Sequence, residues 1–158
     1  GSQGAKALNE KLPKKLKEIA NNFGIEVTHQ TGLTAQNRVD EQYQALDLEA
    51  TVVAFISRMD DAYNGADIVV CRAGALTVSE LASAAMPSVL IPFPNAVDDH
   101  QTQNGEQLQK AGAAVVHCHV RDPETGTPSR SSIFKLWTPL DNRKGCKQIP
   151  KRLVLGPR

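Results

Sequence analysis

Residues 66–80 hold side chains that could bind a nucleotide sugar. They read ADIVVCRAGALTVSE, in which a β-branched run, IVV, precedes the small residues AGA. This pattern predicts a buried strand, a tight turn and a helix that Glu80 enters, with Thr77 and Ser79 as candidate helix caps. Free amides at a helix start attract phosphate, and a carboxylate one turn later can accept hydrogen bonds from sugar hydroxyls. An ordinary strand-to-helix turn uses the same small residues, so this segment alone leaves both interpretations open.

Two further segments carry groups of a similar kind. The glycine-rich residues 1–5, GSQGA, are expected to form a loop leading into a helix, and its amides and the Ser2 hydroxyl could hold a diphosphate. Residues 98–104, DDHQTQN, are a polar stretch that could extend the site or simply begin a helix. Each segment alone is weak evidence for a binding site, but three such loops at one edge of a sheet indicate a common binding crevice.

The elements that position these loops follow from apolar periodicity. Apolar residues at helical spacing predict a first helix that ends near Gly24, with a kink or break at Pro13. Further helices are predicted at residues 36–45 and 100–110, a helical turn at 60–63, and strands at 25–29, 51–56, 68–70, 88–93 and 113–116. Short buried strands that alternate with helices are typical of an α/β fold with a Rossmann-like, doubly wound parallel sheet, in which ligands bind at the carboxyl ends of the strands.

Both ends of the chain depart from this pattern. A phosphate-binding loop normally follows a strand, yet no strand precedes residues 1–5, so the first domain, residues 1–122, reads as truncated at its N-terminus. Glycine and proline interrupt the basic residues 123–158, where no helical or strand periodicity stands out. We therefore expect an irregular tail there, because so few apolar residues could not form a second core.

Composition narrows the class of protein. The 158 residues carry 18 basic and 17 acidic side chains, a net charge of +1, which gives no electrostatic reason to expect a nucleic-acid partner. The three cysteines, Cys71, Cys118 and Cys146, are widely spaced and favour reduced thiols in a cytosolic setting over a disulfide framework. No apolar run approaches the roughly 20 residues that cross a bilayer, and the start of the chain lacks a secretory pattern, so any membrane contact should be peripheral.

Several segments, taken together and in order, resemble a known family. GSQGA, the FISRM segment at 55–59, ADIVVCRAGALTVSE, and the PFP loop followed by DHQTQN are similar to the C-terminal half of the undecaprenyl-diphospho-muramoylpentapeptide N-acetylglucosaminyltransferases, the MurG family. The similarity spans residues 1–116, so it is more specific than any single motif. It implies a GT-B architecture of two Rossmann-like domains, of which this chain would be the donor-binding one.

The resemblance also implies which residues would bind UDP-N-acetylglucosamine. These are Ser2, Ile56, Ala75, Leu76, Thr77, Val78, Ser79, Glu80 and Gln101. Ser2 would contact the diphosphate, the main chain of Ile56 would recognise the uracil, and residues 75–79 would wrap the phosphates and the sugar. Glu80 would hold the ribose hydroxyls, and Gln101 would reach the hydroxyls of the N-acetylglucosamine.

The reaction implied is transfer of N-acetylglucosamine to the muramic acid 4-hydroxyl of lipid I, with inversion, which gives lipid II. The acceptor site, the membrane-facing patch and the general base belong to the family's N-terminal domain, so we expect no catalytic residue in this chain, and no cofactor or obligatory metal. Full-length members are cytoplasmic and peripheral at the inner face of the cell membrane.

Arg72 also matches the family pattern, and a structural salt bridge is an alternative role for its side chain. A non-catalytic nucleotide-sugar-binding module that needs a separate acceptor subunit is an alternative function.

A second resemblance begins near the end of the first. Residues 111–130, AGAAVVHCHVRDPETGTPSR, are similar to a segment of the β-keto acid cleavage enzymes, in which the histidines that match His117 and His119 bind a divalent metal. Alternate residues of a strand point to the same side and can share one ion. Two imidazoles do not complete a zinc site, so a metal-binding fragment of such an enzyme is the lesser alternative, and two exposed histidines at a strand end are the simpler interpretation.

Overall fold

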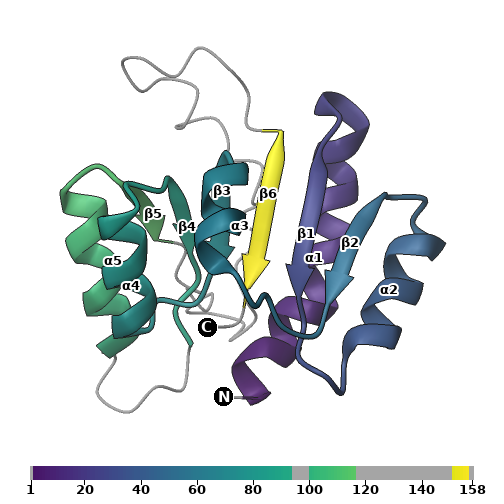
Figure 1. Ribbon diagram of the computed structural model, residues 1–158, viewed down its shortest axis with the longest axis horizontal. Coiled ribbons are helices and arrows are strands. Elements are labelled where there is room, and N and C mark those ends of the chain that lie inside the picture. Colours follow the sequence, from purple (N-terminus) through teal and green to yellow (C-terminus); the bar gives the residue numbers. More distant parts are fainter. Residues whose placement is uncertain (1, 94–99, 117–150, 157–158) are drawn as a thin grey trace, which may run out of the picture.

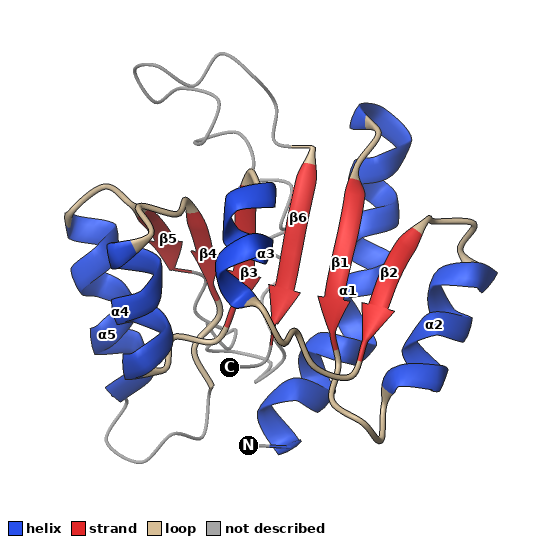
Figure 2. Ribbon diagram, in the orientation of Figure 1, coloured by secondary structure: helices blue, strands red, loops and turns tan. Residues whose placement is uncertain are grey.

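Short runs of β-branched and aliphatic residues form one parallel sheet with helices on both faces (Figures 1 and 2). The computed structural model describes residues 2–93, 100–116 and 151–156. Its strands are β1 (Glu26–Gln30), β2 (Ala50–Val53), β3 (Ile68–Cys71), β4 (Ser88–Leu90), β5 (Ala114–Val116) and β6 (Arg152–Gly156), in the order β2-β1-β6-β3-β4-β5. Its helices are α1 (Ser2–Phe23), α2 (Gln36–Ala45), α3 (Met59–Gly65), α4 (Ala75–Ser83) and α5 (His100–Lys110).

Two apolar cores lie on opposite faces of the sheet. The first joins α1 and α2 to the strands through residues such as Leu12 and Val39. The second joins α3, α4 and α5 through Tyr63, Leu81 and Leu108. Strands covered on both faces read as continuous apolar runs, which is why the sequence predicted them as buried strands. The α/β doubly wound sheet is confirmed.

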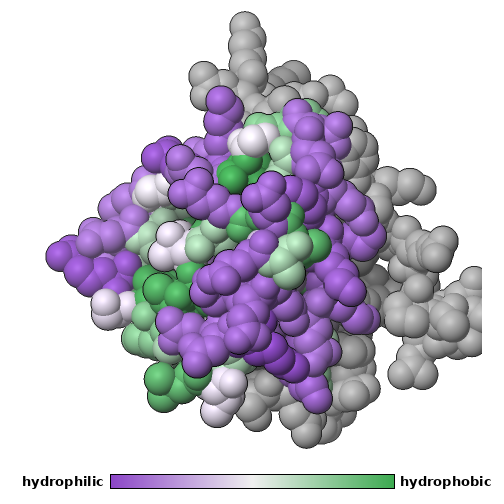
Figure 3. Space-filling model, turned by 90° about the vertical axis from the view of Figure 1, so that its right-hand side faces the viewer, coloured by the Kyte–Doolittle hydropathy of each residue, from purple (hydrophilic) through white to green (hydrophobic). Residues whose placement is uncertain are grey.

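Helix α2 closes the β2 edge of the molecule. It buries Val39 and Tyr43 against the first core and leaves most of its other, largely polar side chains partly or fully exposed. The surface at this end of the molecule is accordingly mostly hydrophilic (Figure 3). A helix with this pattern shields the exposed edge of a sheet from pairing with another chain.

Several element boundaries differ from the sequence-based expectation. The strands predicted at 51–56 and 88–93 end earlier, at Val53 and Leu90, where the chain turns into the loops at the carboxyl edge of the sheet. Residues 2–5, expected as a loop, lie in the first turn of α1, and Pro13 lies inside this single helix. The predicted turn at 60–63 is a full helix, α3.

The largest correction concerns the C-terminal tail. Residues 123–158 were expected to be irregular, but residues 152–156 form β6 in the centre of the sheet, between β1 and β3. Leu153 and Leu155 pack into the first core and Val154 into the second. The run Leu153–Leu155 is as short and apolar as that of β3, but it ends a basic segment interrupted by glycine and proline, and its partners are distant in sequence, so the local pattern did not indicate a strand. Residues 123–150 lie outside the described residues.

Asp67 holds the start of β6 in register. Its Oδ2 accepts hydrogen bonds from the main-chain N–H groups of Lys151, at 2.9 Å, and Arg152, at 2.8 Å, and its Oδ1 from the Arg152 guanidinium at 3.2 Å. Burial opposes ionisation of this carboxyl, but the hydrogen bonds and the charge of Arg152 outweigh it and lower the pKa of Asp67. The contact helps to fix the register of β6, which lies in the centre of the sheet while β5, the strand before it among the described residues, lies at the far edge.

A buried polar network ties α1 to β1 and α2. Asn9 donates from Nδ2 to the carbonyl oxygen of Thr31 at 3.0 Å, so its Oδ1 is the acceptor for His29 Nε2 at 3.1 Å. His29 Nδ1 then accepts the hydroxyl proton of Tyr43 at 2.9 Å. The network therefore fixes a neutral imidazole with its proton on Nε2, and burial lowers the pKa of His29 to about 4.

Candidate functional site

The segment singled out by the sequence forms a strand, a turn and a helix start at the carboxyl edge of the sheet. Gly74, with φ −65° and ψ 147°, is the N-cap of α4, and no side chain caps it. The predicted capping roles of Thr77 and Ser79 are wrong. Thr77 is buried, and Ser79 donates its hydroxyl to the Ala75 carbonyl at 3.0 Å, one turn back within the helix. The first-turn amides of α4 therefore have no side-chain acceptor at the cap.

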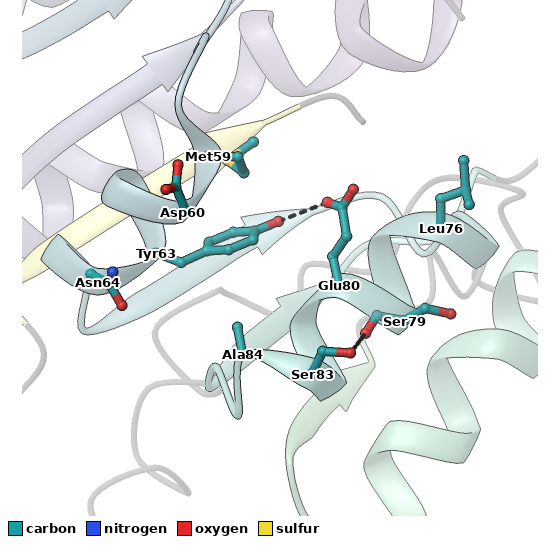
Figure 4. Close-up of a pocket in the computed structure, with 9 residues that line it drawn as sticks. All are labelled: Met59, Asp60, Tyr63, Asn64, Leu76, Ser79, Glu80, Ser83 and Ala84. Carbon is teal, nitrogen blue, oxygen red and sulfur yellow. Dashed lines mark hydrogen bonds between the residues drawn. The ribbon is translucent and has the colours of Figure 1, made fainter.

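A pocket of about 550 Å³ opens between α3 and α4 (Figure 4). It is lined by Met59, Asp60, Tyr63, Asn64, Leu76, Ser79, Glu80, Ser83 and Ala84. In Figure 4 the Glu80 carboxylate points from α4 toward the Tyr63 ring on α3, and the Tyr63 hydroxyl donates to Glu80 Oε2 at 3.3 Å. The volume falls in the range of small-molecule sites, and the Tyr63 contact orients the carboxylate.

Cys71, at the end of β3, is not a candidate nucleophile in this site. Burial, and secondarily the nearby negative charge of Glu80, raises the pKa of the Cys71 thiol to about 12. A thiol with such a pKa is protonated at neutral pH and unreactive. Cys71 contributes to the second core instead.

The structure brings some of the expected site residues together and separates others. Leu76, Ser79 and Glu80 line the pocket. Ile56 lies in the loop after β2 and Gln101 in the first turn of α5, both outside the residues that line the pocket. Gln101 Oε1 accepts a hydrogen bond from the Phe93 amide at 2.9 Å. In a parallel sheet, the loops after successive strands share one edge, so these residues lie at the same edge of the sheet as the start of α4 but outside the pocket.

The structure adds pocket residues that the sequence did not indicate. Tyr63, Met59 and Asp60 all come from α3, which was expected only as a short turn. The spacing of Met59 and Tyr63, four residues apart, is the signal that could have placed both on one face of a helix.

Arg72 has a structural role at the end of β3. Its side chain is buried, and Nη1 donates to the carbonyl oxygens of Ile91 and Pro92, both at 2.9 Å. The guanidinium also lies over the ring of Phe93, 5.5 Å from the ring centroid. Burial lowers the pKa of Arg72. These contacts hold the chain after β4 against the end of β3.

Close packing holds α5 beside the site. A Cβ placed on Gly105 would lie 2.9 Å from Val116 Cγ2 and 3.6 Å from the Ala73 Cβ. The neighbouring Asn104 donates from Nδ2 to the Ala73 carbonyl at 3.2 Å. Glycine at position 105 therefore lets α5 approach both β5 and the turn that leads into α4.

Gly105→Ala should lower the free energy of unfolding by about 1 kcal/mol, because the overpacking cost exceeds the gain in helix propensity. Urea denaturation followed by circular dichroism measures this change. Gly65→Ala at the end of α3 is the matched control, since a Cβ there meets nothing within 4 Å. A Gly105→Ala protein as stable as the parent chain would contradict the packing argument.

Neither a metal-binding cluster nor a membrane-spanning helix is found among the residues that the structure describes. Residues 2–93, 100–116 and 151–156 contain no group of three or more His, Cys, Asp or Glu that could hold a metal ion. The expected histidine pair, His117 and His119, lies outside the described residues. Among the helices that the structure describes, none is long and apolar enough to cross a membrane.

Comparison with known proteins places this chain in a family. The model of the glycosyltransferase family 28 C-terminal domain matches residues 1–124. The UDP-N-acetylglucosamine–N-acetylmuramyl-(pentapeptide) pyrophosphoryl-undecaprenol N-acetylglucosamine transferases of Pseudomonas fluorescens and Pseudomonas entomophila are 53% and 54% identical to this chain over 116 residues. Those matches cover 73% of this chain and 33% and 32% of the relatives, so the chain spans about a third of their length.

A solved structure agrees with these relatives. The crystal structure of Acinetobacter baumannii MurG matches with a TM-score of 0.74 and 41% identity, covering 91% of this chain and 40% of that protein. The sequence match and the fold match thus point to the same proteins, over the segment that contains α4 and its pocket. This chain belongs to the glycosyltransferase family 28 C-terminal domain family.

Proposed function

We propose that this chain binds UDP-N-acetylglucosamine and is the donor-binding half of an inverting transferase that converts lipid I to lipid II. The observation that carries the proposal is the pocket in which Glu80 lies on the same helix as the uncapped amides that follow Gly74. The helix start can bind an anion, and the carboxylate can bind a group rich in hydroxyls. A nucleotide sugar supplies both, as its diphosphate and its ribose.

The proposed roles follow the chemistry of each group. The first-turn amides of α4, at Ala75, Leu76 and Thr77, bind the diphosphate. Glu80 accepts hydrogen bonds from the ribose hydroxyls, and Tyr63 holds its carboxylate in position. Thr77 acts through its main chain only, because its side chain is buried. Ser2 at the start of α1 contacts the diphosphate, and Gln101 at the start of α5 contacts the sugar.

The base of the nucleotide is proposed to contact the main chain of Ile56. The Ile56 N–H donates to the side-chain Oε1 of Gln30 at 2.9 Å, and Gln30 itself is only 4% exposed at the end of β1. Gln30 thus fixes the loop after β2 and occupies the Ile56 amide. The Ile56 carbonyl is then the main-chain group that reads the base, as an acceptor for a ring N–H such as that of uracil.

Gln30→Met should weaken binding of UDP by about 10-fold and lower the free energy of unfolding by about 1–3 kcal/mol, because the Ile56 amide loses its buried acceptor. Calorimetric titration with UDP and urea denaturation measure the two effects. Gln44→Met on the exposed face of α2 is the matched control. If Gln30→Met is destabilised but binds UDP with unchanged affinity, the main chain of Ile56 does not take part in base recognition.

Catalysis in this proposal needs an acceptor-binding domain. The general base and the lipid site lie outside this chain, and the α4 amides stabilise the departing diphosphate. We place the complete enzyme in the cytoplasm, peripheral at the inner face of the cell membrane.

Titration calorimetry of the chain with UDP-N-acetylglucosamine tests donor binding, with UDP-glucose and CDP as comparison ligands. Saturable binding that prefers the uridine nucleotide supports the proposal, and no heat with a folded chain refutes it. Adding a separately produced acceptor-binding domain and lipid I then tests transfer. Binding without any transfer would favour a nucleotide-sugar-binding module.

A further inference from the structure

Three large apolar side chains lie exposed at one edge of the sheet. Among the residues that the structure describes, the large hydrophobic side chains left exposed are Leu33, Phe55 and Leu76, at 86%, 62% and 82%. They follow the carboxyl ends of β1, β2 and β3. Scattered apolar residues are normal on a surface, but three at the edge where parallel sheets bind ligands indicate a functional surface. Leu76 lines the pocket, whereas Leu33 and Phe55 do not.

Leu33 and Phe55 leave two segments that lie side by side. The Gly32 N–H donates to the Ala54 carbonyl oxygen at 3.0 Å, and Leu33 and Phe55 are the residues that follow these two. This bond continues the contact between the two chain segments past the ends of β1 and β2. Gly32 has φ 81°, a left-handed conformation that glycine adopts without strain. The backbone that carries the two apolar side chains is therefore held in one arrangement.

The main-chain group proposed to read the base belongs to the same segment. Ile56 follows Phe55, and its side chain is 9% exposed and packs into the second core. The Ile56 N–H is held by Gln30 Oε1 at 2.9 Å. Because the Ile56 side chain points into the core, the exposed Phe55 side chain lies at the surface directly before the Ile56 carbonyl.

A pyrimidine base needs two kinds of contact. Its polar edge forms hydrogen bonds, and its flat faces pack against aromatic or aliphatic side chains. Tyr63, the aromatic residue of the pocket, is only 9% exposed, and its hydroxyl donates to Glu80. Phe55 is thus the more accessible aromatic side chain for a base whose edge lies at Ile56.

We propose that Phe55 and Leu33 form a base clamp, which packs against the faces of the uracil ring while the Ile56 carbonyl binds its edge. The inference rests on the proposed function and names the side chains that position the base in that site. Met59, three residues after Ile56, lines the pocket. A nucleotide with its ribose at Glu80 can therefore extend its base past Met59 toward the clamp.

Phe55→Ala should weaken binding of UDP by about 10-fold, within the range found when an aromatic side chain that stacks on a base is replaced. Phe55→Tyr keeps the ring and should bind UDP as the parent chain does. Leu33→Ala should cause a smaller loss, because an aliphatic side chain covers less of the ring. Titration calorimetry measures the dissociation constants. Urea denaturation should show little change in stability, since both side chains are exposed.

A modified ligand separates the faces of the base from its edge. 5,6-Dihydro-UDP keeps the ring N–H and both carbonyl groups of uracil, but its saturated ring is puckered and stacks poorly. The parent chain should bind it about 10-fold more weakly than UDP. Phe55→Ala should bind the two nucleotides with similar affinity, because the ring and the base form one coupled pair in the parent chain.

Leu76→Ala is the matched control for this comparison. Leu76 is an exposed apolar side chain at the same edge of the sheet, but it lines the pocket on α4. Its loss should therefore leave the preference for UDP over 5,6-dihydro-UDP at the parent value, whatever it does to the affinity for both.

The outcomes distinguish the base clamp from the proposed function. If Phe55→Ala keeps the parent preference, or if the parent chain has no preference, the clamp is overturned while nucleotide binding stands. Unchanged UDP affinity in Phe55→Ala and Leu33→Ala also overturns it, and the two side chains then contact something else, such as another protein. A folded parent chain that binds neither nucleotide refutes the proposed function and the clamp with it.

Discussion

Glu80→Ala is expected to weaken binding of UDP to this chain by about 10- to 100-fold, the value of one or two hydrogen bonds to a charged group. The carboxylate lies in the pocket between α3 and α4. Its Oε2 accepts a hydrogen bond from the Tyr63 hydroxyl, which orients the carboxylate group. Titration calorimetry gives the dissociation constants directly. Tyr63→Phe should cause a smaller, several-fold loss, because it removes only the group that orients Glu80.

A modified ligand makes this test specific to the ribose. 2′-Deoxy-UDP lacks one of the hydroxyls that Glu80 is proposed to hold, so the parent chain should bind it more weakly than UDP. The Glu80→Ala variant should bind the two nucleotides equally, because the 2′-hydroxyl no longer has a carboxylate to contact. Hydroxyl and carboxylate form one coupled pair in the parent chain. Glu41→Ala on α2 serves as the control for a lost surface carboxylate. If Glu80→Ala keeps the full preference for UDP over 2′-deoxy-UDP, the carboxylate acts elsewhere in the site.

Local sequence patterns were sufficient for the parts of the fold that depend on neighbouring residues. The IVV run in β3 and the helical spacing of apolar residues in α1 predicted a strand and a helix that the structure confirms. The AGA turn placed the start of α4 at the carboxyl edge of the sheet, and the pocket lies between this helix and α3. Each of these features is determined within about fifteen residues of sequence, which is the length over which periodicity can be read.

Features that depend on distant partners could not be read in this way. β6 is recognisable only by its pairing with β1 and β3, more than 80 residues away in the sequence. The contact of Tyr63 with Glu80 spans 17 residues, and that of Gln30 with the Ile56 amide spans 26. Glutamine is mostly exposed in proteins and tyrosine is intermediate in burial, so neither residue type indicated these contacts. The bonds from Arg72 to the carbonyl oxygens of Ile91 and Pro92 likewise span 19 and 20 residues and were not indicated by its residue type.

Acid is expected to destabilise this protein through His29 before its carboxylates are protonated. The pKa of His29 is about 4 in the folded chain and 6.5 in the unfolded one, because burial disfavours the imidazolium. Between these pH values only the unfolded chain binds the proton. The folded state therefore has its full stability above pH 6.5 and loses stability as the pH drops toward 4. The free energy of unfolding should decrease by about 3 kcal/mol over this window.

Urea denaturation at half-unit steps from pH 7.5 to pH 4 measures this dependence, and His29→Gln isolates its source. The variant should be less stable at neutral pH, since Asn9 and Tyr43 lose their shared partner, but it should lose most of the pH slope. Asp67 does not obscure the result, because hydrogen bonds lower its pKa and it titrates below the window. Parallel pH curves for the parent chain and His29→Gln would mean that the buried network tolerates a charged imidazole, with Tyr43 turning its hydroxyl oxygen toward the added proton as acceptor.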